Sequence, residues 1–335
     1  MGHHQLNEIE ALTKKALLAH GASTFAAAEV ARAVRQAEGR GNKICGLYYV
    51  ESYCQQLQSG RVNGTVDPVV SSPRPASIRV DAGYGFAQPA FALGLVPALD
   101  AARRFGTATL AVAHAHTCTS LGYFTEQIAR AGFIAIGFTN ASPIVAAPGG
   151  KTRVIGTNPI AFSVPDGQGG IAMQFDQSTT TVALGKITMA KALGEQIPLG
   201  WALDAAGEPT TDPSAALSGS LVSTGGYKGW GFGLMAEILA AGMTGSVLSR
   251  NVKPLKAPDG PHHDLGQFYI VMDPTTSPEF AARVAALAEA VAADEGARMP
   301  GQSLQDIDPV SVAEDTWDRL VELSLGPAKL DTAPG

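Results

Sequence analysis

The sequence predicts a mixed α/β protein, of the α+β type, whose lobes are interleaved along the chain. Short apolar runs typical of buried strands gather in the middle of the sequence, and helical patterns occupy both ends. No internal repeat and no low-complexity linker divides the 335 residues. A chain of this length can form a large core and two or three lobes. We therefore expect intertwined lobes rather than separate domains in a row.

The composition is that of a globular protein with few charges, since 45% of the residues are hydrophobic and 16% are charged. The net charge of −6 argues against nucleic acid or an anionic membrane as the main partner. Cys45, Cys54 and Cys118 show no CxxC spacing, which favours reduced thiols. The first residues lack the apolar core of a signal peptide, and no apolar run reaches the roughly 18–20 residues that span a bilayer. We expect a cytoplasmic protein.

The N-terminal part is predicted to be helical. Residues 6–38 have the spacing of two helices, and Ser23 or Thr24 is a suitable cap for the second. A glycine-rich loop from Gly39 to Gly46 leads into an amphipathic helix over Leu47–Ser59. The segment after it is expected to be extended chain with one strand, Ala76–Val80.

The middle of the chain is predicted to build the sheet. A helix over Pro89–Phe105 precedes four apolar runs with strand character: Leu110–Ala113, Phe133–Thr139, Ile160–Val164 and Ile171–Phe175. Polar side chains fall at the ends of these runs, where a rigid sheet usually carries its functional loops. A helix over Leu121–Ala131 begins just after Thr119 and Ser120, and its free N–H groups make an expected anion site.

The C-terminal half alternates helices with one further strand. The expected elements are helices over Val182–Ala192, Gly231–Thr244, Pro278–Glu295 and Val310–Leu325, and a strand over Gly266–Met272. The chain then divides into a helical segment with a loop (1–75), a sheet segment (76–275) with a helical insertion at about 182–245, and a second helical segment (276–335).

Three local patterns have a functional and a structural interpretation. Gly231–Ala236 matches the dinucleotide fingerprint GxGxxA, but no long buried strand precedes it, so close helix packing is the better interpretation. His114 and His116 face the same side of a strand end, but no carboxylate stands near them and we predict no metal site. Lys43 and the helix start at Leu47 could lower the pKa of the Cys45 thiol, although a packed, inert cysteine is the simpler interpretation.

The order of the longer motifs is more informative. The chain contains RGxxxxGLYxxxxYxxxLxSGRVN (40–63), VDxGxGFxQ (80–88), HTxxxLGYF (116–124), FTN (138–140), GTNPIAF (156–162) and GGYKGWGFGLMAEIL (225–239). This order resembles the malate/L-lactate dehydrogenase family of the second type, which is distinct from the classical Rossmann lactate dehydrogenases. The resemblance runs from about Leu6 to Leu320, and GTNPIAF and GGYKGWG are its most specific parts.

The resemblance implies a largely antiparallel sheet without a Rossmann fold, which binds NADH or NADPH and is flanked by helical segments from both termini. Members are typically homodimers that reduce small 2-oxo acids, cyclic 2-imino acids or sugar-derived oxo acids. Thr157 matches a position that meets the substrate carboxylate. The family's cofactor contacts fall on Thr117, Cys118, Thr119, Ser120, Leu121, Asp176, Gln177, Ser178, Thr179, Lys228, Gly229, Pro300 and Gly301.

The chain departs from the family at the expected proton donor. Ile44 and Cys45 replace the usual serine and histidine, and Tyr49 stands at a substrate-binding position that usually holds arginine. Cys45 and His116 are the remaining candidates for the catalytic acid. A ketone needs such an acid, worth roughly 10²–10⁴ in rate, whereas an imine can arrive already protonated. We therefore expect a 2-imino acid to be preferred; a 2-hydroxy acid dehydrogenase or an inactive cofactor-binding protein is the alternative.

Overall fold

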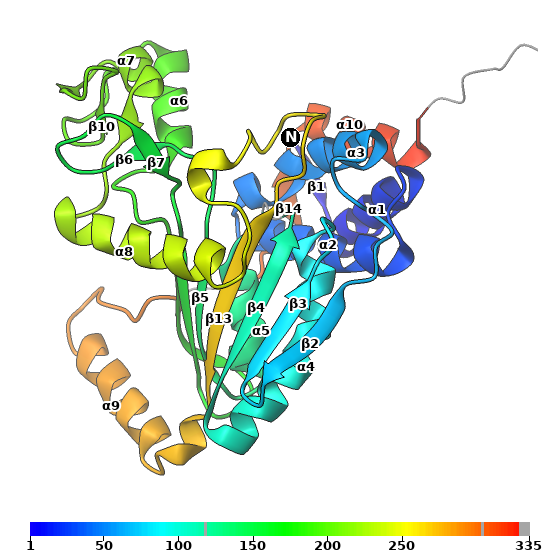
Figure 1. Cartoon of the computed structure of the whole chain (residues 1–335), viewed down its shortest axis with the longest axis vertical. Helices are drawn as coiled ribbons and strands as arrows, with labels where there is room; N and C mark the ends of the chain where they lie inside the picture. Colours follow the sequence, from blue (N-terminus) through cyan, green and yellow to red (C-terminus); the bar gives the residue numbers. More distant parts are fainter. Residues whose placement is uncertain (117–118, 303–304, 328–335) are drawn as a thin grey trace, which may run out of the picture.

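A seven-stranded sheet forms the centre of the computed structural model, which describes residues 1–116, 119–302 and 305–327. Its order is β2 (Val69–Arg74), β3 (Ser77–Asp81), β4 (Thr107–Ala115), β13 (Leu265–Met272), β5 (Ile134–Thr139), β8 (Ile160–Pro165) and β9 (Ile171–Gln177) (Figure 1). Among these strands only β3 and β4 pair in parallel. The prediction of a largely antiparallel sheet is confirmed. The strand β2 was not expected, because Ser72, Pro73 and Arg74 break the apolar alternation that marks strands.

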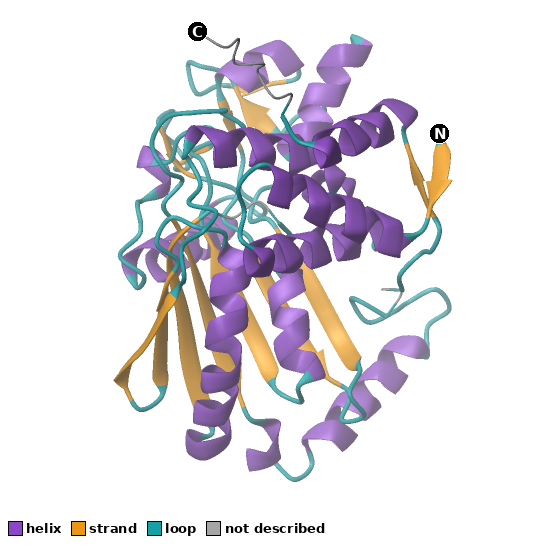
Figure 2. Cartoon of the chain, turned by 90° about the vertical axis from the view of Figure 1, so that its right-hand side faces the viewer, coloured by secondary structure: helices purple, strands orange, loops and turns teal. Residues whose placement is uncertain are grey.

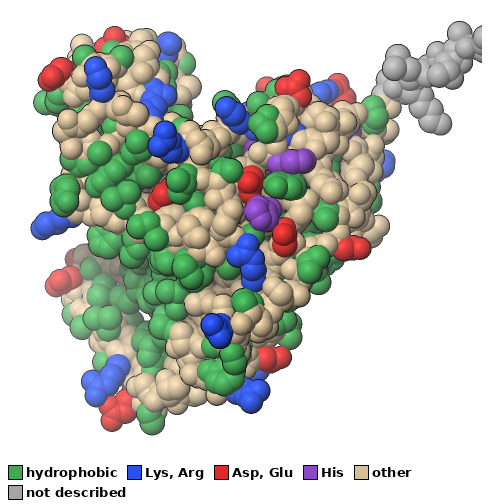
Figure 3. Space-filling view, viewed as in Figure 1, with side chains coloured by type: hydrophobic (Ala, Val, Ile, Leu, Met, Phe, Trp, Pro, Cys, Tyr) green, Lys and Arg blue, Asp and Glu red, His purple; other side chains and the backbone are tan. Residues whose placement is uncertain are grey.

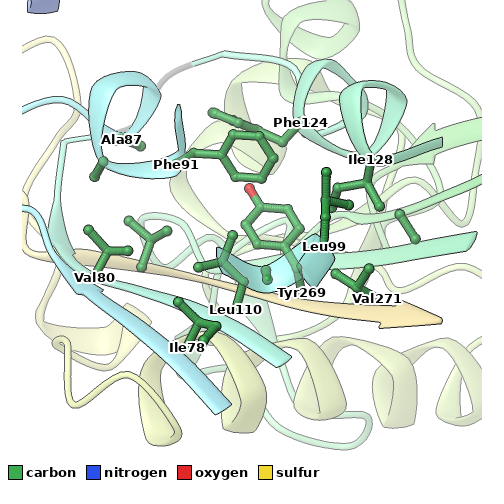
Figure 4. Packing of buried hydrophobic residues seen from close by; sticks show 14 of the residues in the cluster. Ile78, Val80, Ala87, Phe91, Leu99, Leu110, Phe124, Ile128, Tyr269 and Val271 are labelled. Atoms are coloured by element: carbon green, nitrogen blue, oxygen red, sulfur yellow. The ribbon is translucent and has the colours of Figure 1, made fainter. Parts of the chain in front are cut away.

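Two helices cover one face of this sheet, α4 (Ala87–Phe105) and α5 (Gly122–Arg130) (Figure 2). The main core lies between them and the strands, where the rings of Phe91 and Phe124 meet Tyr269 of β13 (Figure 4). A Cβ atom on Gly94 of α4 would stand 2.6 Å from Cδ1 of Leu110, so glycine permits the close approach of helix and sheet. Three of the four apolar runs predicted as buried strands are largely buried, whereas Ile171–Phe175 of the edge strand β9 is mostly half-buried.

Helices from both termini form a second core beside the sheet. They are α1 (Leu6–Ala19), α2 (Thr24–Gly39), α3 (Val50–Ser59) and α10 (Glu314–Leu325). The Ser23 side chain caps α2 by accepting a hydrogen bond from the N–H of Ala26, as predicted. The expected helix over Val310–Leu325 is wrong at its start, because Val310–Val312 form strand β14 and pair with β1 (Gly2–His4). The partner strand lies about 300 residues away in sequence, so local periodicity cannot reveal it.

The loop after α2 is built from tight turns. A 3-10 turn, η1 (Lys43–Cys45), is followed by a second, η2 (Leu47–Tyr49), before α3 begins. The helix predicted over Leu47–Ser59 is therefore regular only from Val50. This arrangement places Cys45 on a short turn rather than directly before a long helix.

A smaller lobe lies at one end of the sheet (Figure 1). Its five-stranded sheet has the order β11 (Pro209–Thr210), β10 (Ala202–Leu203), β12 (Ser220–Leu221), β6 (Val145–Ala146) and β7 (Arg153–Ile155), with helices α6 (Leu184–Leu193) and α7 (Pro213–Ser218). Its own core includes Ile187 and Trp230. Several of its strands fall within the insertion expected to be helical, because strands of two residues are too short to show a period of two.

The helices α8 (Tyr227–Glu237) and α9 (Phe280–Ala292) lie on the side of the main sheet opposite to α4 and α5. The helix α8 continues into a π-helical turn, η3 (Ile238–Gly242), and packs on that face through Ala236. The helix α9 stands apart from the sheet in Figure 1, and none of its 13 residues is buried. In the described part of the chain, no helix is long and apolar enough to cross a membrane.

Candidate active site

Cys45 lies close to Asp176 of β9, and its thiol is a weak acid. Burial, followed by the negative charge of Asp176, raises the pKa of Cys45 to about 12, and a hydrogen bond with Asn42 opposes part of the increase. The interpretation in which Lys43 lowers the thiol pKa is wrong, because burial dominates, and the Lys43 ammonium donates to the carbonyl oxygen of Ser311 at 3.0 Å. Cys45 is therefore a protonated thiol at neutral pH.

Asp176 occupies the start of α5. Its carboxylate accepts hydrogen bonds from Oγ of Ser120 at 2.6 Å and from the N–H of Gly122 at 2.8 Å. Burial raises the pKa of Asp176, while these hydrogen bonds oppose the increase. The helix start that we expected to bind an anion thus already holds the protein's own carboxylate, which would repel a phosphate. A pocket of about 260 Å³ between α2, α5 and β9 is lined by Ser120, Asp176 and Gly301.

His116 is buried and neutral. The amide nitrogen of Gln56 donates to the carbonyl oxygens of Leu255 and Ala257, so its oxygen is the acceptor and Nε2 of His116 is the donor at 2.7 Å. Burial, followed by the charges of His263 and Arg61, holds the pKa of His116 well below its usual range. Its Nδ1 atom therefore carries no proton at neutral pH, and its Nε2 proton is engaged by Gln56.

Aromatic rings connect Tyr49 with His116. The Tyr49 ring stacks on that of Tyr53 with centroids 6.0 Å apart, and Tyr53 meets the edge of His116 at 5.5 Å. The ammonium of Lys256 lies 5.5 Å from the Tyr49 centroid. The predicted substrate-binding position thus carries an aromatic ring with a cation beside it.

Thr157 is joined to the end of β9. Its carbonyl oxygen accepts hydrogen bonds from the N–H and the hydroxyl of Thr179, both at 2.9 Å. A second pocket, of about 550 Å³, opens next to it between the sheet and α8. Predicted cofactor residues lie along this pocket, namely Gln177, Ser178, Thr179, Lys228 and Gly229. The predicted cofactor residues therefore divide between two pockets on either side of β9.

The remaining predicted residues adjoin residues that line the smaller pocket or lie outside the described residues. Pro300 accepts a hydrogen bond from the N–H of Gln174 at 2.9 Å, which places the Pro300–Gly301 turn against β9. The Thr119 hydroxyl is buried and has no hydrogen-bond partner among the described residues, and Leu121 is buried just before α5. Thr117 and Cys118 lie outside the described residues.

The sequence interpretation missed Glu237. This buried carboxylate of α8 accepts hydrogen bonds from Nδ2 of Asn158 at 2.8 Å and from the N–H of Ser249 at 2.7 Å. It therefore ties the turn that carries Thr157 to the helix that carries Lys228. A single acidic residue within the apolar run GFGLMAEILAAG was the available signal. Among the described residues, no group of three or more His, Cys, Asp or Glu side chains is arranged to hold a metal ion.

Solved structures with this fold define the class of protein. The structure matches delta1-piperideine-2-carboxylate reductase from Pseudomonas syringae pvar. tomato with a TM-score of 0.88 and 31% identity, over 96% of this chain and 100% of that one. It also matches sulfolactate dehydrogenase from Methanocaldococcus jannaschii, with a TM-score of 0.88 and 26% identity over 96% of each chain. The chain is an oxidoreductase that uses a nicotinamide cofactor without a classical Rossmann fold.

The chain belongs to the malate/L-lactate dehydrogenase family, whose model matches residues 4–312. The (2R)-3-sulfolactate dehydrogenase (NADP(+)) of Chromohalobacter salexigens is 39% identical over 297 residues, which cover 88% of this chain and 89% of that protein. The Delta(1)-pyrroline-2-carboxylate reductase of Ancylobacter novellus is 35% identical over 302 residues, with 89% and 88% covered. The family resemblance predicted from the motifs is confirmed.

Proposed function

We propose that the protein uses NADH or NADPH to reduce a small 2-imino or 2-oxo carboxylate at C2, and that it prefers the imine. Relatives named for sulfolactate and for pyrroline-2-carboxylate support a small carboxylate as the substrate class. The cofactor supplies the hydride when bound, and the protein orients both partners and controls proton supply. The preference for an imine depends on the groups around Cys45.

The weak acidity of Cys45 is the observation that carries this preference. A general acid works best when its pKa lies near the working pH. The pKa of Cys45 is raised to about 12, and the thiolate left after proton donation would be buried beside Asp176. His116 is neutral, buried and already bonded to Gln56, so it is an equally poor donor. An iminium substrate needs no proton in the hydride step, whereas a ketone does.

The pocket beside Lys228 fits a dinucleotide. Lys228 and the uncapped N–H groups at the start of α8 present positive charge suited to phosphates. Behind them, Ile136, Phe138 and Ile160 provide an apolar wall for a flat ring. We assign the phosphates to this pocket rather than to the start of α5, because Asp176 occupies that helix end. Thr157, bonded to Thr179 at the edge of the same pocket, is the proposed contact of the substrate carboxylate.

A second copy of the chain is the proposed partner on the open face. Phe232 and Ile238 of the α8–η3 segment are 56% and 62% exposed beside the apolar pocket. Figure 3 shows hydrophobic side chains gathered in the hollow between the small lobe and α9. Exposed apolar faces of this kind are typical of subunit interfaces. We propose an isologous homodimer in which the second copy closes the outer wall of the cofactor pocket.

An inactive cofactor-binding protein is the second candidate, and the lack of a strong proton donor favours it. Fluorescence titration with NADH and NADPH, followed by steady-state turnover of Δ1-pyrroline-2-carboxylate, Δ1-piperideine-2-carboxylate, pyruvate and sulfopyruvate, separates the two. We expect turnover, with higher kcat/KM for the cyclic imines than for either oxo acid. Cofactor binding without turnover of any of the four would favour the inactive protein. A higher kcat/KM for pyruvate would contradict the preference for imines.

A further inference from the structure

The ammonium of Lys256 rests on the aromatic rings next to the Cys45 loop. Its Nζ atom lies 3.3 Å from the ring centroid of Tyr48 and 5.5 Å from that of Tyr49. A cation above a tyrosine ring is attracted by the negative face of the ring. Both tyrosines belong to η2, which follows the turn that ends in Cys45. A residue more than 200 positions away thus places a positive charge beside this loop.

Buried donors fix the backbone on both sides of Lys256. The amide nitrogen of Gln56, a fully buried side chain of α3, donates to the carbonyl oxygens of Leu255 and Ala257, each at 2.7 Å. Arg61 also donates to the Ala257 oxygen, and Nε2 of His263 lies 3.1 Å from the Leu255 oxygen. The polar cluster around His116 therefore holds the loop that carries Lys256. These hydrogen bonds fix the backbone from which the exposed Lys256 side chain extends to the tyrosine rings.

Lys256 keeps its charge available, whereas the cations on the segment before Cys45 are engaged. Arg40 forms ion pairs with Glu126 at 3.0 Å and Asp306 at 2.6 Å, and Lys43 donates to a backbone carbonyl. Within the described residues, no carboxylate lies at ion-pair distance from Lys256. Lys256 lines a pocket of about 300 Å³ together with Glu51 and Asp315, and Glu51 pairs with Arg319 at 2.9 Å.

We propose that Lys256 is a second substrate-binding residue, which supplies the positive charge for the substrate carboxylate in addition to the contact proposed for Thr157, with Tyr49 as the flat surface beside it. The position of Tyr49 cannot supply this charge, and the loop at 255–257 brings a cation to the same rings. A lysine ammonium is a compact charge that suits a small carboxylate at the edge of an aromatic surface. This inference rests on the proposed function, because it takes the substrate to be a 2-imino or 2-oxo carboxylate.

Lys186 is the competing cation. It lies in the first turn of α6, and the Cβ position of the preceding residue, Gly185, is 3.6 Å from Cδ1 of Ile44. The small lobe therefore also reaches the Cys45 loop, and Lys186 is an independent test of which cation holds the carboxylate. Lys253 supplies a matched control, since it lies three residues before Lys256 in the same loop and is exposed.

The test measures binding of pyrrole-2-carboxylate, a planar analogue that cannot be reduced, to the full chain with NADP⁺ bound. We expect Lys256→Ala to weaken binding at least tenfold, Lys256→Arg to bind within threefold of the parent, and Lys253→Ala to match the parent. Binding of the uncharged pyrrole-2-carboxamide should not respond to Lys256→Ala. With Δ1-pyrroline-2-carboxylate, Lys256→Ala should raise KM at least tenfold and change kcat less than threefold.

Three outcomes overturn this inference alone. If Lys256→Ala binds the carboxylate within twofold of the parent, or if Lys186→Ala causes the loss instead, a different residue holds the charge. If the carboxamide loses affinity as much as the carboxylate, Lys256 acts by shape and not by charge. These results leave the proposed function standing, because the parent still binds and reduces the imine. A parent that neither binds pyrrole-2-carboxylate nor turns over any of the four substrates removes both proposals.

Discussion

The side-chain amide of Asn158 donates a hydrogen bond to the carboxylate of Glu237 at 2.8 Å, and both residues are buried. Asn158 adopts a left-handed backbone with φ of 37°, which is unfavourable for a residue with a side chain and persists only where its surroundings enforce it. Its amide also donates to the carbonyl oxygen of Gly233 at 3.1 Å. The turn that carries Thr157 is thus locked to α8.

We expect Glu237→Gln to disturb this turn and to destabilise the protein. The amide group would place an N–H against the donors of Asn158 and Ser249, so the charge-assisted hydrogen bonds are lost at about 2 kcal/mol in the free energy of unfolding. Urea unfolding measures this change, and KM for the imine should also rise because Thr157 is displaced. Glu289→Gln, on the exposed α9, is the control. Parent-like unfolding of Glu237→Gln would show that the network is dispensable.

Replacing Lys228 should weaken cofactor binding and leave the stability of the cofactor-free protein nearly unchanged. If its ammonium meets a phosphate, Lys228→Ala loses about 1.5–3 kcal/mol of cofactor binding, the range for hydrogen bonds to charged groups. Lys228 is exposed and at the first turn of α8, so the melting temperature without cofactor should hardly change. Titration of cofactor fluorescence gives the affinity, and Lys191→Ala in the last turn of α6 is the control. Unchanged affinity would make Lys228 a surface residue without a cofactor role.

The Cys45 thiol should be dispensable for imine reduction. Because its pKa is raised to about 12, it does not ionise between pH 6 and pH 9, and the rate should show no step from this group in that range. We expect Cys45→Ser to reduce Δ1-pyrroline-2-carboxylate within about tenfold of the parent, below the usual loss of a general acid. Steady-state rates on the imine and on pyruvate measure this. Loss of pyruvate reduction alone would identify the thiol as the acid for ketones.

The buried histidines should make the protein sensitive to acid. The pKa of His116 is held well below 6.5 and that of His263 is lowered to about 3, both mainly by burial. A lowered pKa in the folded state means that the unfolded chain binds more protons below pH 6.5, so stability is present above that pH and falls as the pH decreases. Each histidine contributes a slope of about 1.4 kcal/mol per pH unit in this range.

Urea unfolding between pH 7.5 and pH 4.5 measures this slope. We expect His116→Asn to lower the slope of stability against pH by the contribution of one histidine. The variant should also be less stable at every pH, because the hydrogen bond with Gln56 is lost. His3→Asn is the control, since His3 is exposed near the start of the chain. A slope equal to that of the parent would mean that His116 is protonated in the folded state.

The open apolar face should mediate assembly. We expect the parent to have a dimeric mass by light scattering at micromolar concentration. Ile238→Asp should shift it toward the monomer, because the new charge would be buried at the proposed interface. Leu193→Asp is the control, as Leu193 is 67% exposed at the end of α6 in the small lobe. A monomeric parent would exclude the dimer.

Local patterns in the sequence were sufficient to predict most helices and the long buried strands. The predicted helix over Pro89–Phe105 differs from α4 by two residues, and the strand over Phe133–Thr139 differs from β5 by one. These elements have strong periodicity, which depends only on neighbouring residues. Motif order along the chain similarly pointed to the family, because GTNPIAF and GGYKGWG depend on residues close in sequence.

Contacts between segments distant in sequence decided the charge and protonation state of the site residues, which local patterns could not predict. The Asp176 carboxylate accepts a hydrogen bond from Gly122 at the start of α5, 54 residues earlier in the chain. It therefore occupies the expected anion site. Lys256 lies on the Tyr48 ring in a loop whose backbone Gln56 and Arg61 hold, and burial in the same cluster keeps His116 neutral. Burial and long-range pairing set the charge and pKa of these groups, and neither property is encoded in the residues that stand next to them in sequence.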